Sequence, residues 1–123
     1  MKENVIKNKS FNFAVRIVKL NKYLWDEKNE YVLSKQLLRS GTSIGANVCE
    51  SENAQSTDDF IHKLNIALKE ANETEYWLKL LIHTEYITKE QYESISKDCK
   101  ELNRILITII RTTKEKKNSK TDN

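Results

Sequence analysis

The sequence has 123 residues, no proline and only two glycines. Proline and glycine are the residues that most often interrupt regular structure, so long uninterrupted segments are expected. Leu, Ile, Lys, Glu and Ala, which favour helix, occur throughout the chain. These features together predict an all-α protein. The length fits a single domain with its own hydrophobic core, so neither a disulfide nor a metal is needed for stability.

Long apolar runs are also missing. No segment approaches the roughly 18 to 20 apolar residues of a membrane span, and the N-terminus MKENVIKNKS lacks the apolar stretch of a signal peptide. The sequence therefore predicts a cytoplasmic protein with no membrane partner.

The residues used most often for catalysis and metal binding are sparse. His62 and His83 are the two histidines, and they would lie about 31 Å apart on one helix. Asp59 and His62 have the spacing of a bundle metal site, but such sites need a second copy. The chain has no P-loop, G-x-G-x-x-G or G-x-S-x-G motif. We predict a non-enzymatic protein without metal, cofactor or catalytic residues.

The two cysteines carry no recognisable motif. Cys49 and Cys99 stand fifty residues apart, without a C-x-x-C pair or a histidine at ligand spacing. Both are predicted to be buried free thiols.

Apolar periodicity predicts four helices. The first two span about Lys9 to Trp25 and about Tyr31 to Glu50. The third begins near Ser56 or Thr57, and the fourth begins near Thr88, where Thr88 to Gln91 has the form of a capping box. Residues spaced alternately by three and four form two clear seams, namely Phe60, Leu64, Ala67, Ala71, Thr74, Leu78 and Leu81, and then Tyr92, Ile95, Cys99, Leu102, Leu106 and Ile109.

Short connections between the four helices favour an up-and-down four-helix bundle. The bundle is assigned to residues 9–112, with an N-terminal extension at 1–8. Residues 113–123 are polar, rich in lysine and without periodicity, so they are predicted to form a disordered basic tail.

The two glycines are four residues apart, as Gly41 and Gly45. On a continuous helix this spacing leaves a bare groove for another backbone, whereas the alternative is a break in the second helix. The polar residues of the second and third helices are interpreted as forming contacts between helices or between subunits. The alternative interpretation is that they form a functional site. The residues assigned to close helix packing or assembly are Gly41, Gly45, Asn47, Glu50, Glu70 and Glu73.

Charge is unevenly distributed along the chain. Residues 1–49 carry nine Lys/Arg and four Asp/Glu, whereas residues 50–110 carry seven and twelve. This asymmetry fits either a basic surface for a polyanion or complementary faces within or between subunits. The first predicted helix has no acid between Lys9 and Trp25, and its cations share one face. The candidate nucleic-acid contacts are Lys9, Arg16, Lys19, Lys22, Lys35 and Arg39, to which the lysines of the tail could add.

Helices two and three carry a family resemblance. The segments are QLLRSGTSIGANV (36–48) with Glu50, AQS (54–56), DFIHKL (59–64), IALKEA (66–71), ET (73–74) and YWL (76–78). They resemble the bacterial four-helix-bundle proteins encoded in intervening sequences of large-subunit ribosomal RNA genes. The chain is also similar, more distantly, to accessory proteins of diversity-generating retroelements. Many relatives have glycine where this chain has Ser51, which implies a less sharply turned exit from the second helix.

The resemblance implies a left-handed bundle that assembles into a ring, commonly a pentamer, and a link to RNA. We therefore expect a homo-oligomer that binds structured RNA or another nucleic acid through backbone phosphates. The alternative is a protein-interaction scaffold, for example an accessory subunit that docks a polymerase or reverse transcriptase.

Overall fold

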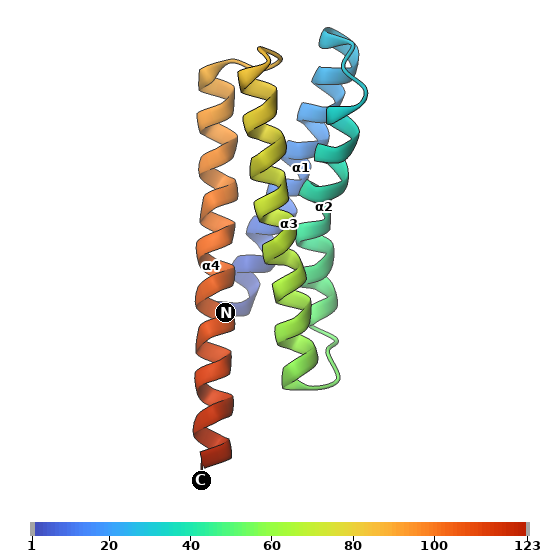
Figure 1. Ribbon diagram of the computed structural model, residues 1–123. Coiled ribbons are helices and arrows are strands. Elements are labelled where there is room, and N and C mark those ends of the chain that lie inside the picture. Colours follow the sequence, from blue (N-terminus) through green and yellow to red (C-terminus); the bar gives the residue numbers. More distant parts are fainter. Residues whose placement is uncertain (1, 123) are drawn as a thin grey trace.

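The computed structural model describes residues 2–122, with side chains described for residues 5–120. The chain runs up and down through four helices, as Figure 1 shows. The predicted all-α, single-domain four-helix fold is confirmed. The helices are α1 (Lys2–Lys28), α2 (Leu33–Ser51), α3 (Thr57–His83) and α4 (Lys89–Asp122).

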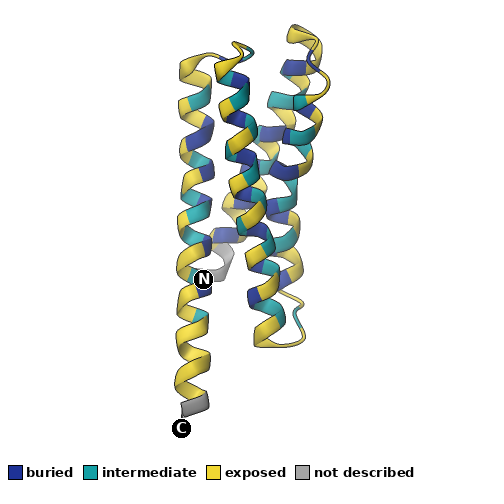
Figure 2. Ribbon diagram, viewed as in Figure 1, coloured by how far each residue is buried: buried dark blue, intermediate teal, exposed yellow. Residues whose placement is uncertain are grey.

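The first and last helices are longer than expected. α1 begins at Lys2, so residues 2–8 belong to this helix and are not a separate extension. α4 continues through Asp122, so residues 113–122 are helical where a disordered tail was predicted. This last part of α4 projects beyond the bundle and is mainly exposed (Figure 2). An ion pair between Lys117 and Asp58 connects it to the start of α3.

The connection between α1 and α2 is set by local hydrogen bonds. Asn29 adopts a positive φ of 52°, and the Glu30 amide then donates to the Leu24 carbonyl at 3.0 Å. The Glu30 carboxylate accepts hydrogen bonds from the first amides of α2, including that of Ser34 at 2.7 Å. These amides would otherwise lack partners, so Glu30 fixes where α2 begins.

The predicted starts of α3 and α4 are confirmed by their caps. The Ser56 hydroxyl accepts from the Asp59 amide at 3.0 Å, so α3 begins at Thr57. Ahead of α4, the Thr88 amide donates to the Gln91 side chain at 2.8 Å, and the Gln91 amide donates to the Thr88 hydroxyl at 3.1 Å. This reciprocal pair is the capping box expected from the sequence.

The core follows the predicted seams. Six of the seven seam residues on α3 are buried, and the seventh, Phe60, is half-buried. On α4 the four central seam residues are buried, with Tyr92 and Ile109 half-buried at the ends. The buried residues face inward along all four helices (Figure 2). Between α2 and α3, the Thr74 hydroxyl donates to the Ser40 hydroxyl at 3.0 Å, so this buried polar pair is satisfied.

Gly41 and Gly45 lie on a continuous α2 and face α1. A Cβ on Gly41 would lie 2.7 Å from Cγ1 of Ile17, and a Cβ on Gly45 would lie 3.3 Å from the Ser10 carbonyl oxygen. Both distances are shorter than ordinary van der Waals contact. The absence of side chains at these positions therefore allows α1 to pack directly on the α2 backbone.

We predict that Gly45→Leu lowers the free energy of unfolding by about 1 to 3 kcal/mol, because the new side chain meets the backbone of α1. The matched control is Ala46→Leu, since Ala46 is exposed on the same helix. This control should change stability by less than about 0.5 kcal/mol. Chemical denaturation followed by circular dichroism measures both variants. Equal stability of the two would contradict the close packing at Gly45.

Candidate functional site

Two of the predicted nucleic-acid contacts on α1 are ion-paired with α4. Arg16 lies 2.6 Å from the Asp98 carboxylate and also donates to the Ser94 hydroxyl at 2.8 Å. Lys9 lies 3.3 Å from Glu101. These two cations of α1 and their partner acids on α4 therefore neutralise each other within the subunit. Exposed pairs of this kind contribute little stability, but they orient the two helices.

The other four candidates do not complete a single basic surface. Lys19, Lys22 and Lys35 are exposed, with no ion pair among the described side chains. Arg39 lies 3.4 Å from Glu70 and also pairs with Glu73, so it joins α2 to α3. Three of the six predicted cations are thus paired with acids in the same subunit.

Three of the residues assigned to packing or assembly, Glu50, Glu70 and Glu73, form ion pairs between α2 and α3. The Trp77 indole donates to Glu73 at 3.0 Å, next to the Arg39 pair. Glu50 lies 3.5 Å from Lys63, and the Asn47 amide donates to the Ser43 carbonyl at 2.8 Å. These contacts give the polar side chains partners within one subunit.

α1 has an apolar stripe on its outer surface. We define the α1 stripe as Phe11, Val15, Val18 and Trp25, whose exposed fractions are 66%, 38%, 37% and 51%. Their spacing of four, three and seven residues is that of a helix-packing seam, with Lys22 at the intervening position. Trp25 also contacts Tyr31 edge to face, with ring centroids 4.4 Å apart. α1 therefore has two apolar faces, and the core covers only one of them.

α4 carries a basic stripe that the sequence analysis did not identify. We define the α4 basic stripe as Lys97, Lys100, Arg104, Arg111 and Lys114. These residues lie within an arc of about 100° and extend over about 26 Å of helix. Their side chains are exposed and form no ion pair with any described residue. Their spacing of three, four, seven and three residues was present in the sequence, but acidic residues between them obscured it.

The 23S rRNA-intervening sequence protein family matches residues 2–108, which is most of the chain. The chain belongs to this family. The resemblance inferred from helices two and three is therefore confirmed.

A solved structure supports the assignment of this chain to the 23S rRNA-intervening sequence protein family. It is a protein of unknown function from the S23 ribosomal protein family of Bacteroides thetaiotaomicron. The two proteins are 69% identical, with a TM-score of 0.89 over 90% of this chain and 99% of that one. No curated protein matches this chain. The family match ends at Thr108, so the projecting part of α4 lies outside it.

Two structural features are not found among the described residues of this family member. Within that part of the chain, no three His, Cys, Asp or Glu side chains are grouped so as to hold a metal. None of its helices is long and apolar enough to cross a membrane.

The two thiols differ in environment. Cys99 is buried, as predicted, and its thiol donates to the Ala71 carbonyl at 3.4 Å. Burial, reinforced by the nearby Glu75 carboxylate, raises the pKa of Cys99 from 9.0 to about 12. Cys49 is exposed, so its predicted burial was wrong. Cys49 lies on the outer side of α2. Its apolar neighbours in the sequence did not indicate that this side of the helix is exposed.

We predict that a thiol reagent at pH 8 modifies Cys49 of the folded chain rapidly, because Cys49 is exposed whereas Cys99 is buried. Cys99 should react at least about 100-fold more slowly, since it stays protonated and reacts only when the fold opens. Mass spectrometry of a time course measures both rates. Cys49→Ser is the control, and rapid modification of that variant would contradict the buried position of Cys99.

Proposed function

We propose that this protein is a non-enzymatic homo-oligomer that binds structured RNA, or another polyanion, through backbone phosphates. The observation that carries the RNA part is the α4 basic stripe, which presents five exposed and unpaired cations along one face. Phosphate contacts need such cations at intervals along a surface, and no base-specific motif is required. The proposal moves the main contact from α1, where Lys9 and Arg16 are paired, to α4.

The α1 stripe supports the homo-oligomer. An exposed seam of large apolar side chains on one helix is typical of a surface that packs against another helix. We place a second copy of the chain on this surface. A ring, for which the family resemblance implies five subunits, would repeat the α4 basic stripe around the assembly. Repetition raises the avidity of contacts that are individually weak.

The oligomer is tested by Val15→Glu with Val18→Glu, which places two charges in the centre of the α1 stripe. We expect the assembly to dissociate with helical content unchanged, because burying unpaired charges at an interface is costly. Sedimentation velocity measures the particle mass. The control is Tyr76→Glu with Ile107→Glu, which alters exposed apolar side chains on other helices. If the α1 variant keeps the mass of the unaltered protein, the interface lies elsewhere.

RNA binding is tested with a fluorescent RNA hairpin at several salt concentrations. The α4 variant combines Lys100→Glu, Arg104→Glu and Arg111→Glu. It should weaken binding and reduce the slope of log K against log salt by about 2 to 3, because each lost phosphate contact removes about 0.9. The charge-matched control combines Lys19→Glu, Lys35→Glu and Lys69→Glu, which change exposed lysines outside the α1 stripe and the α4 basic stripe. A larger effect from this control would move the site away from α4, and no binding by the unaltered protein would end the RNA proposal.

The second candidate function is a scaffold that docks another protein. It is favoured by the same α1 stripe, which would suit an apolar partner surface if the chain does not self-associate. Docking on apolar side chains depends weakly on salt, whereas phosphate binding falls steeply as salt rises. A monomeric chain with no affinity for the hairpin would favour this candidate.

A further inference from the structure

The lower end of the bundle in Figure 1 holds an apolar cavity of about 360 Å³. All four helices contribute side chains to it. Val48 and Leu64 are buried in its wall, and Phe60 and Ile109 are half-buried. Ile6 of α1 closes another side. A volume of this size lies within the range of small-molecule sites, and its lining is largely apolar, as such sites are.

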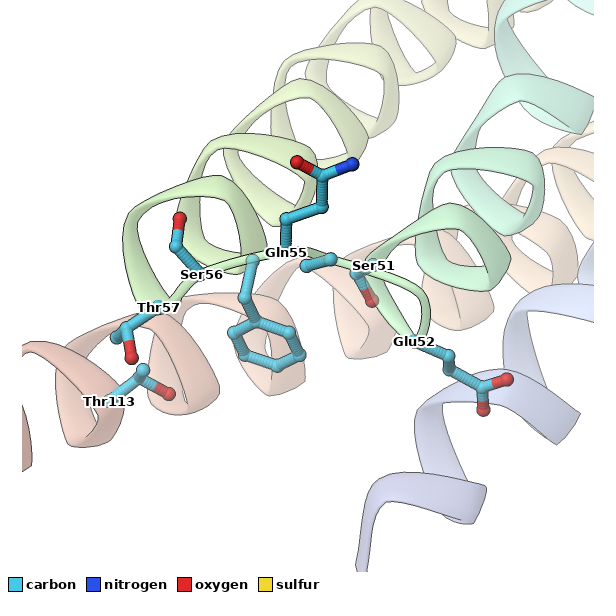
Figure 3. A pocket seen from close by; sticks show the side chains of 8 residues that line it. Ser51, Glu52, Gln55, Ser56, Thr57 and Thr113 are labelled. Carbon is cyan, nitrogen blue, oxygen red and sulfur yellow. The ribbon is translucent and has the colours of Figure 1, made fainter.

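The mouth of the cavity is basic. Lys116 lies at the edge of the cavity and also in an adjoining hollow with Lys117 and Lys120. Thr113 lines both spaces. Figure 3 shows a neighbouring pocket at the same end of the bundle, in which Thr113 of α4 lies beside Thr57, and Ser51 and Glu52 lie farther along the wall.

Two of the acids at this end are already engaged in ion pairs. Glu52 pairs with Lys7 at 3.2 Å, and Asp58 pairs with Lys117. Lys116 and Lys120 form no ion pair with any side chain between residues 5 and 120. The start of α3 adds a positive helix dipole at the same edge. An apolar interior below two free ammonium groups suits a ligand with an apolar body and an anionic head.

We propose that this cavity binds a small amphiphilic anion, namely a straight-chain carboxylate of roughly eight to twelve carbons, which fits a cavity of this volume. The acyl chain lies among Val48, Leu64 and Ile109, and the carboxylate contacts Lys116 and Lys120 at the mouth. The part of α4 that carries both lysines lies beyond the region matched by the family. The ligand site is therefore a property of this chain and does not rest on the proposed RNA binding.

Calorimetric titration of the full chain with hexanoate, octanoate and decanoate tests the site. We expect saturable binding with one ligand per chain, tightening about fourfold for each added methylene group until the cavity is filled. Nonyltrimethylammonium carries the opposite charge on the same nine-carbon alkyl chain and should bind at least about fivefold more weakly than decanoate. Equal affinity of the two ligands, or no saturable binding of decanoate, overturns the proposal.

Variants locate the site. Lys116→Glu should weaken decanoate binding at least about fivefold, whereas Lys100→Glu, the same change on the outer face of α4, should leave it within twofold. Thr108→Trp, at an exposed position of the lining, should fill the cavity and abolish binding. Thr112→Phe provides a second filling variant, and circular dichroism checks that each remains helical. Decanoate binding that survives both filling variants places the ligand elsewhere and overturns the assignment.

The RNA and carboxylate sites can be separated by testing both ligands on the same two variants. Lys116→Glu should reduce decanoate binding and keep most of the hairpin affinity, whereas Arg104→Glu should do the reverse. Loss of decanoate binding in Arg104→Glu but not in Lys116→Glu would contradict the position of the carboxylate.

Discussion

The contact between α1 and the bare backbone of α2 at Gly41 and Gly45 determines how the rest of the molecule is arranged. Because no Cβ separates the two helices there, Ile17 and the Ser10 backbone lie directly against α2. This contact fixes the rotation of α1 about its own axis. One apolar face of α1 then joins the core, and Phe11, Val15 and Val18 are directed outward. The same rotation turns Arg16 toward Asp98 on α4.

The opposite charges of the two halves of the sequence are partly used inside the subunit. Ion pairs connect α1 with α4 and α2 with α3, through Arg16 and Arg39 among others. This outcome matches the second interpretation of the charge asymmetry, in which complementary faces attract each other. Pairing neutralises Lys9 and Arg16 on α1, whereas the α4 basic stripe stays exposed and without ion pairs among the described residues. Assembly, phosphate binding and ligand binding are consequently assigned to different surfaces.

Much of the fold could be predicted from the sequence, because local rules govern it. Helical periodicity identified the buried seam from Leu64 to Leu81, and capping rules placed the starts of α3 and α4 at Ser56 and Thr88. The candidate site was harder to predict, because it depends on neighbours distant in the sequence. Arg16 and Asp98 are 82 residues apart, and no local pattern reveals that they meet. The exposure of Cys49 likewise depends on which side of α2 remains uncovered.

The central claim is that the outer face of α1 is covered by another copy of the chain. Light scattering coupled to size exclusion on the unaltered protein, over a range of concentrations, tests it most directly. The account predicts a particle whose mass is a whole multiple of the 14.4 kDa chain and stays constant on dilution to micromolar levels. A mass of 14.4 kDa at every concentration would contradict it and leave the α1 stripe to a different partner.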